Sequence, residues 1–503
     1  MKPTLSSAAD CQSILCGVLF AALTLGCSTP GDGSPVGGDG PGTGGGGPTG
    51  GGNPSAGASG PGTAGNINLG GLPPGQDGPC SGLECEVPKC EAGTTTTISG
   101  KVFDPAGKLP LYNVLVYVPN GPLPPFTDGI SCDRCATSVS NPVTSTITDE
   151  NGAFKLTNAP AGQEVPIVFQ VGKWRRQIKV AASPCTETAL TDVNQTRLPR
   201  DRTEGDIPRI AIAAGGADAM ECFPRRLGIS DSEFTTSAGD GRIHLYTATD
   251  SRYNDLSVKA FDASLNGGAA LPHSTELWQD IETLKKYDIV VLSCEGDTMA
   301  SEKPMPSREA LYEYLSLGGR VFASHFHHIW FSGGPQAVQS VGTWRTRTDP
   351  LRESGTLPAT VDQSFPKGAA LAQWLVNVGA STTLGTLDVN MPRDNIQAVD
   401  PMLAREWITL ENPRASGMGM SKSVQYMSFN APVGAPEEEV CGRAVFTGLH
   451  VSTTVEDEEE QPPGFPLSCT GTELSPEEKA VAFMLFDLSS CVQSDEKPPQ
   501  IPK

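Results

Sequence analysis

Two short stretches decide the fold of the C-terminal part of the chain: YDIVVLSC at residues 287–294 and GGRVFASH at residues 318–325. Each contains an apolar run of the length of a buried strand, and residues 307–317 between them have the pattern of a helix. Further strands are predicted at 209–214, 241–246 and 441–450, and a closing helix at 475–488 begins with a Ser cap followed by Pro. Strands that alternate with helices predict a doubly wound α/β domain with a mostly parallel sheet, over residues 207–493.

Upstream of this domain the pattern changes to short strands separated by turns. Residues 98–103, 114–118, 148–156 and 165–170 are strand-like, with turn signals such as DPAG at 104–107 and TDENG at 148–152. Strands of this length and spacing predict a small all-β sandwich, which we place at residues 80–206 together with a Cys-rich flank. Residues 494–503 are predicted to be a disordered tail.

The first 79 residues are predicted to lie outside any fold. Residues 14–25 (ILCGVLFAALTL) are too short to span a bilayer, so residues 1–26 are interpreted as a signal peptide. Residues 31–75 contain 20 Gly and 7 Pro and almost no apolar side chains, so residues 27–79 are predicted to be a disordered tether.

The end of the signal segment, LTLGCS at 23–28, resembles the lipobox of bacterial lipoproteins. The resemblance implies that Cys27 is acylated and becomes the new N-terminus. Ser28 after the Cys implies sorting to the outer membrane, on its periplasmic or cell-surface face. The lipid bilayer is therefore an expected partner, held through several acyl chains.

Charge and cysteine content agree with an exported protein. With 36 Lys and Arg against 57 Asp and Glu, the net charge of −21 argues against nucleic acid as a partner. Fourteen Cys are many for a cytosolic chain and indicate an oxidising compartment.

Eleven cysteines remain after Cys27, so at least one is unpaired within the chain. The pair Cys132 and Cys135 is compatible with a redox pair, half a zinc site or a structural bridge, and disulfides among the six N-terminal cysteines are the favoured interpretation. In the α/β domain Cys222 is expected near Cys294, Cys469 and Cys491 flank the closing helix, and Cys441 is left over. The disulfide candidates are Cys80, Cys85, Cys90, Cys132, Cys135, Cys185, Cys222, Cys294, Cys469 and Cys491.

Polar residues gather where the predicted parallel strands end. In such sheets ligands bind beyond the carboxyl ends of the strands. Four of the chain's six His follow two of these ends, and carboxylates and a thiol follow neighbouring ones. The predicted ligand cleft comprises Gly215, Gly216, Asp218, Cys294, Glu295, His325 and His450.

Both folded regions resemble known families. Residues 97–182, with ISGKVFDPAG and TDENGAFKLTNAPAG, resemble the carboxypeptidase regulatory-like (transthyretin-like) domain, which implies a non-catalytic spacer or adhesion module. Residues 207–492, with YDIVVLSCEGD, GGRVFASHFHH and GRAVFTGLH, resemble the class I glutamine amidotransferase-like, flavodoxin-like fold and its ThuA-like branch. Because His325 stands where amidotransferases have their nucleophilic Cys, glutaminase activity is not expected.

Two functions follow as hypotheses. The first is an envelope binding protein whose cleft recognises a small, carbohydrate-like ligand without chemistry. The second is a metal-assisted hydrolase of the ThuA-like, carbohydrate-related type, with a divalent metal such as zinc held by His325, His327 and His450, and Asp297 or Glu295 as a further ligand or base. Without a metal, Glu295 and His325 remain candidates for an acid/base pair.

Overall fold

The structure is a computed structural model that describes residues 80–135, 139, 141–249, 257–345, 355–412, 421–451, 463–469, 471 and 473–501. The predicted signal peptide, the tether and Cys27 lie outside the described residues. The chain divides into two compact units, Met1–Gln76 and Asp77–Lys503, and the description below concerns the second. Of the helices in the described part of the chain, none has both the length and the apolar character needed to cross a bilayer.

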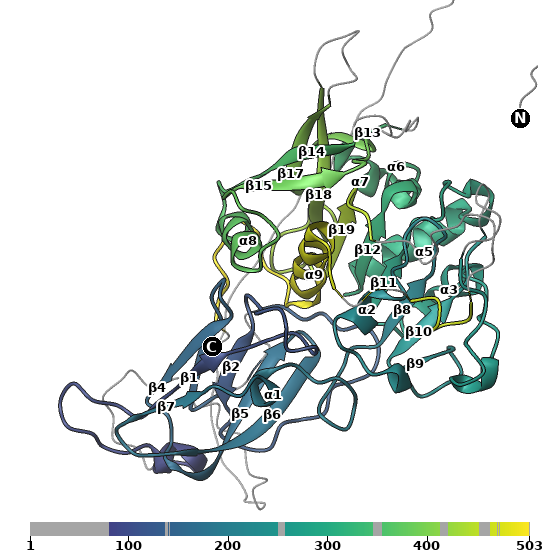
Figure 1. The fold of residues 1–503 in the computed structure, drawn as a ribbon. Coiled ribbons are helices and arrows are strands. Elements are labelled where there is room, and N and C mark those ends of the chain that lie inside the picture. The colour runs from purple at the N-terminus through teal and green to yellow at the C-terminus, as the bar shows by residue number, and fades with distance from the viewer. Residues whose placement is uncertain are drawn as a thin grey trace, which may run out of the picture. The chain divides into compact units, whose positions relative to one another are not determined.

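The first part of this unit consists of two small sheets, as the sequence predicts (Figure 1). One sheet has the order β4-β1-β7 and the other β3-β2-β5-β6. Apolar side chains such as Ile98, Val116 and Phe169 face one shared core, whereas the alternate face of β2 and β5 carries a second, small buried cluster of Leu115, Tyr117 and Val168. The strands are β1 (Thr97–Lys101), β2 (Leu115–Val118), β3 (Thr144–Ile147), β4 (Ala153–Thr157), β5 (Gly162–Val171), β6 (Trp174–Ala182) and β7 (Glu187–Leu190).

The TDENG segment at residues 148–152 forms the turn that precedes β4. The Asp149 carboxylate accepts hydrogen bonds from the backbone N–H groups of Asn151 and Ala153, both at 2.8 Å. Gly152 has a φ of 71°, a left-handed conformation that Gly adopts without steric cost. The TDENG segment is therefore a turn built from its own side chains.

The second part is a ten-stranded sheet with the order β15-β14-β17-β18-β19-β12-β11-β8-β10-β9. From β19 to β9 every neighbouring pair is parallel, whereas from β15 to β19 every pair is antiparallel. The expectation of a mostly parallel sheet is therefore wrong for the β15-β14-β17-β18 part, the green strands in Figure 1. The strands are β8 (Ile210–Ala213), β9 (Phe234–Thr235), β10 (Ile243–Tyr246), β11 (Ile289–Leu292), β12 (Arg320–Ser324), β14 (Thr356–Val361), β15 (Thr386–Asn390), β17 (Ala404–Asn412), β18 (Ser421–Ala431) and β19 (Gly442–Thr447).

Helices cover both faces of this sheet, because alternate residues of its strands enter two different cores. In β8, Ile210 and Ile212 pack with α2, α8 and α9, whereas Ala211 and Ala213 pack with α3 to α7. The predicted closing helix is present, and Ser475 and Glu478 form a reciprocal capping box at its start. The helices are α2 (Phe223–Arg226), α3 (Thr275–Trp278), α4 (Ile281–Leu284), α5 (Met305–Ser316), α6 (Ile329–Ser332), α7 (Gln336–Gln339), α8 (Pro366–Asn377) and α9 (Pro476–Ser489).

Short elements complete the described chain. A two-stranded antiparallel ribbon pairs β13 with β16 beside the large sheet. The remaining elements are single turns of helix that connect the strands. The ribbon strands are β13 (Gly342–Trp344) and β16 (Ile396–Val399), and the helical turns are α1 (Val193–Thr196), η1 (Gly82–Glu86), η2 (Asp231–Glu233), η3 (Asn266–Gly268), η4 (Ala300–Glu302) and η5 (His325–His328).

Five disulfides join the cysteines in a pattern that corrects the predicted one. Cys132 and Cys135 do not bond each other or the N-terminal flank; they reach into the α/β domain, because the segment that carries them lies against the ends of β19 and α9. Cys294 is the one free cysteine of the described residues, in place of Cys441. The bridges are Cys80–Cys85, Cys90–Cys185, Cys132–Cys441, Cys135–Cys491 and Cys222–Cys469. Such bridges indicate an extracellular or periplasmic protein.

The predicted disordered tail is also corrected, since residues 494–501 are described and held to the domain. The Asp495 side chain is 9% exposed and lies 2.9 Å from Arg443 and 3.6 Å from Lys367. Asp487 of α9 completes the group, at 2.6 Å from Lys367 and 3.0 Å from Arg443. We call these four residues the Arg443 cluster. Two cations and two carboxylates balance one another there, so the last residues are anchored by buried charge.

Candidate functional site

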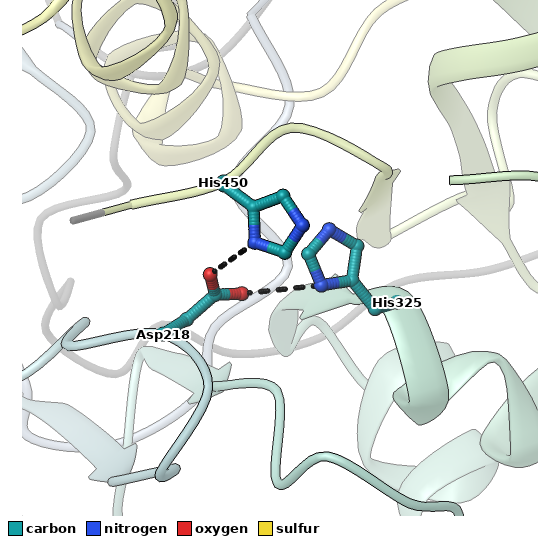
Figure 2. Close-up of side chains that lie close together, drawn as sticks. All are labelled: Asp218, His325 and His450. Atoms are coloured by element: carbon teal, nitrogen blue, oxygen red, sulfur yellow. Dashed lines mark hydrogen bonds and ion pairs between the residues drawn. The ribbon is translucent and has the colours of Figure 1, made fainter. Parts of the chain in front are cut away.

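Three of the predicted site residues meet at the carboxyl edge of the parallel strands (Figure 2). Asp218 follows β8, His325 follows β12 and His450 follows β19, and parallel strands end at one edge of a sheet. One ligand atom from each residue lies within 4.8 Å of the other two. We call this group the Asp218 site; it combines residues more than 100 positions apart.

Close backbone approach makes this meeting possible. A Cβ on Gly215 would stand 2.1 Å from the backbone oxygen of Cys294, so only Gly lets the loop after β8 pass the loop after β11. His325 has a φ of 44°, in the left-handed region that non-Gly residues rarely adopt. The chain therefore turns sharply at the end of β12 and directs the imidazole over the sheet edge, at a conformational cost of about 1–3 kcal/mol.

Hydrogen-bond partners determine which nitrogen of each imidazole carries a proton. Nε2 of His450 lies 3.0 Å from Nε of Arg393, which only donates, so Nε2 accepts and the proton sits on Nδ1, 3.0 Å from Oδ1 of Asp218. Nε2 of His325 lies 2.9 Å from the carbonyl oxygen of Gly448 and therefore donates to it. In neutral His325, Nδ1 therefore carries no proton and presents a lone pair.

That lone pair faces a carboxylate. Nδ1 of His325 is buried, has no hydrogen-bond partner, and lies 3.5 Å from Oδ2 of Asp218. Two electron-rich atoms at this distance need a proton or a metal ion between them. The unpaired Nδ1 is the atom that distinguishes this site from a completed hydrogen-bond network.

Burial sets the protonation of the site. It lowers the pKa of His325 to about 3, with a further contribution from His450, and it lowers the pKa of His450 to about 3 with help from the positive charge of Arg393. Burial also raises the pKa of Asp218, against the opposing effects of His325 and of hydrogen bonds from Ser324 and Val451. Both imidazoles are therefore neutral at neutral pH, the form that binds metals.

Other residues predicted for the metal set lie elsewhere. His327 donates from Nε2 to the Ser293 carbonyl oxygen at 2.6 Å and accepts from Trp330 at Nδ1, so both of its nitrogens are engaged. Asp297 accepts from the backbone N–H of Thr298 and does not belong to the Asp218 site. His327 points away because β12 ends at Ser324 and η5 begins at His325, so the two histidines do not continue the strand.

The proposed acid/base pair of Glu295 and His325 is not formed either. Glu295 is buried and paired at 2.5 Å with Lys303, which is itself buried. Cys294 is a buried thiol whose pKa is raised to about 12 by burial, so it is not a nucleophile at neutral pH. Of the residues predicted to line the cleft, only His450 is half-buried, with 16% of its side chain exposed; the others form a buried floor.

Three residues near the site carried no usable signal in the sequence. Arg393, between β15 and β16, contacts His450 although the two are 57 residues apart. Glu221 is buried with neither carboxylate oxygen paired among the described residues, and burial raises its pKa to about 8. Glu477, at the start of α9, has its pKa raised to about 7 by burial.

Comparisons with known proteins identify partial likenesses. No protein-family model and no curated protein sequence matches the chain. A ThuA-like protein from Bacteroides uniformis has 12% identity and a TM-score of 0.24, covering 48% of this chain and 82% of its own. Agd3, a carbohydrate deacetylase, has 10% identity and a TM-score of 0.23, over 49% of this chain and 29% of its own.

A third likeness involves a different class of protein. A cohesin–X-dockerin complex from Acetivibrio cellulolyticus matches at 15% identity and a TM-score of 0.15, over 29% of this chain and 79% of its own. TM-scores of this size assign neither a family nor a function. The functional argument therefore depends on the geometry of the Asp218 site.

Proposed function

We propose that this chain is an exported metal-dependent hydrolase in which Asp218, His325 and His450 hold one divalent cation. The unpaired Nδ1 of His325, buried 3.5 Å from Oδ2 of Asp218, carries the proposal. A cation between these atoms satisfies both, and His450 supplies a third ligand atom within 4.8 Å. The strand order β10-β8-β11-β12-β19, the 2-1-3-4-5 order of flavodoxin-like sheets, supports it, since ligands bind where that order reverses.

The donor atoms suit zinc. Two imidazole nitrogens and one carboxylate oxygen are ligands that zinc accepts, and three protein ligands are the number typical of catalytic zinc sites. A zinc ion there supplies a coordinated water whose pKa is near 7. The chain's own residues keep both imidazoles neutral, exclude bulk water and fix the carboxylate through Ser324 and the Val451 N–H.

Location and substrate class are parts of the same proposal. The disulfides support export, and the lipobox resemblance supports acylation at Cys27 and attachment to the outer membrane. The ThuA-like resemblance of the sequence motifs supports a carbohydrate as the substrate class. Mass analysis of the N-terminal peptide tests the anchor, because an unmodified Cys27 or cleavage at another position contradicts it.

A binding protein without chemistry is the second candidate, and one contact favours it. Arg393 donates to Nε2 of His450, which fixes the proton on Nδ1 and completes the chain Arg393–His450–Asp218 without a metal. A metal on Nδ1 of His450 would leave the ring proton on Nε2, so Nε of Arg393 would lose this acceptor. The two candidates therefore differ in whether this contact persists.

Zinc titration of the purified full chain, treated first with a chelator, separates the candidates. The hydrolase proposal expects one zinc per chain, with at least about 100-fold weaker binding in His325→Gln and in His450→Gln. His328→Gln is the matched control, since His328 is a buried neighbour that bonds Ser332 and lies outside the site. Folded wild-type protein that binds no zinc, or variants that bind it like wild type, contradict the proposal.

A further inference from the structure

Arg393 has a position that the protein core fixes. Its carbonyl oxygen accepts hydrogen bonds from Oγ of Ser423 at 2.9 Å and from Nε2 of Gln425 at 2.7 Å. Both donors belong to β18 and are fully buried. Because two buried side chains donate hydrogen bonds to this one carbonyl oxygen, the backbone of residue 393 is held in place before any ligand binds.

Only one nitrogen of the Arg393 guanidinium donates a hydrogen bond to a described residue. Nε donates to Nε2 of His450 at 3.0 Å, and among the described residues no carboxylate lies within ion-pair distance of Arg393. The two terminal nitrogens have no partner there and are not among the buried unpaired atoms, so they reach solvent. Arg443, by contrast, has its terminal nitrogens bound to Asn430, Asp487 and Asp495.

We propose that Arg393 is an anion-binding residue of the Asp218 site and that the natural ligand carries a carboxylate or phosphate group. A guanidinium held through Nε presents its two remaining amino groups as a planar fork, which matches two oxygens of such a group. The net charge of −21 repels anions at long range, so recognition requires a cation placed locally.

The contact with His450 locates the bound anion. In the metal-free chain Arg393 touches the half-buried imidazole that forms the exposed side of the site, so an oxyanion on the fork lies beside His450. With a metal on Nδ1 of His450 the contact through Nε would be lost, while the Arg393 carbonyl stays held by Ser423 and Gln425. The inference thus deepens the proposed function by naming a charged group on the substrate. It is testable without the metal, since the fork belongs to the protein.

Acetate and inorganic phosphate are the probes, each titrated by calorimetry into the metal-free full chain, and acetate also into the zinc-loaded chain. We expect Arg393→Gln to weaken binding of the preferred anion about tenfold or more, as loss of charged hydrogen bonds does. Arg393→Lys keeps the charge but not the fork, and an intermediate affinity is expected. Tighter acetate binding assigns a carboxylate, and tighter phosphate binding a phosphate.

Arg345→Gln is the matched control, because Arg345 is a nearby arginine that pairs with Asp394. This variant changes the net charge equally and is expected to bind the probes like wild type. Equal affinity of wild type and Arg393→Gln, equal weakening in Arg345→Gln, or no binding of either probe overturns the inference. If zinc fails to bind but probe binding still depends on Arg393, the metal proposal fails and this one stands.

Discussion

Two buried polar groups lie at opposite ends of β19, and they differ in how their charges are balanced. The Arg443 cluster lies at the start of β19, where two cations are balanced by two carboxylates. Ser428 also donates a hydrogen bond to Asp495. The Asp218 site follows the strand and leaves Nδ1 of His325 unpaired.

The comparison shows that burial alone does not identify a functional site. A buried group whose charges are balanced holds the structure together, as the Arg443 cluster holds the C-terminal residues, although Nε of Arg443 has no hydrogen-bond partner among the described residues. A buried group with an unpaired atom and a left-handed backbone at His325 maintains a strained arrangement, and such arrangements occur at sites that bind something.

The largest effect is expected from Arg443→Met. Removing one cation leaves Asp487 and Asp495 with Lys367 alone, and an uncompensated buried charge lowers the free energy of unfolding by about 3–5 kcal/mol. Urea unfolding measures it. The double variant Lys367→Met, Asp487→Asn keeps Arg443 with Asp495 and is expected to lose less. A cost below about 1 kcal/mol for Arg443→Met would show that the cluster is not structural.

Asp218→Asn should leave stability nearly unchanged and weaken zinc binding. The amide keeps the size of the side chain and removes a buried carboxylate whose pKa is raised by burial, so stability is expected to stay within about 1 kcal/mol of wild type or to rise. Zinc affinity is expected to fall at least about 100-fold. Zinc titration and urea unfolding of the same variant measure the two effects. A strongly destabilised variant would show that Asp218 stabilises the fold instead of binding a metal.

Acid titration of the metal-free protein gives the next contrast. His325 and His450 have folded pKa values of about 3, below the unfolded value, so the unfolded chain binds more protons and stability is lost as pH falls from about 6.5 towards 3. The loss is about 3 kcal/mol per histidine by pH 4. Asp218, whose pKa is raised, opposes part of this loss.

Unfolding measured at several pH values in wild type and in the His325→Gln, His450→Gln double variant tests that effect. The double variant should show a flatter profile between pH 6.5 and 4. Identical profiles would mean that the two imidazoles are not buried in neutral form. Within the described residues the Arg443 cluster contains no His, so it contributes only at more acidic pH.

Cys294→Ser is expected to have the smallest effect. The thiol lies at the end of β11 and belongs to no disulfide, so the substitution should change the free energy of unfolding by about 1 kcal/mol or less. Thiol titration of unreduced, denatured Asp77–Lys503 should find one thiol in wild type and none in the variant. In Cys441→Ser the thiol of Cys132 should appear as a second one, and its absence would contradict the Cys132–Cys441 bridge.

Much of the architecture could be predicted because local patterns encode it. Alternating apolar residues indicated the sandwich, apolar runs ending in Gly or His indicated the parallel strands, and Ser475 with Pro476 marked the start of α9. The antiparallel strands β14 to β18 were missed, and so was the anchoring of Asp495, since its partners Arg443 and Lys367 are distant in sequence.

The sequence by itself determined that polar side chains gather at the carboxyl ends of the parallel strands, because strand ends are local features. Only the tertiary structure decided that Asp218 joins His325 and His450 while His327 turns to Ser293. The turn at His325 and the reach of Arg393 depend on packing between remote segments. Side-chain direction over a sheet edge is set by such packing, which no local pattern records.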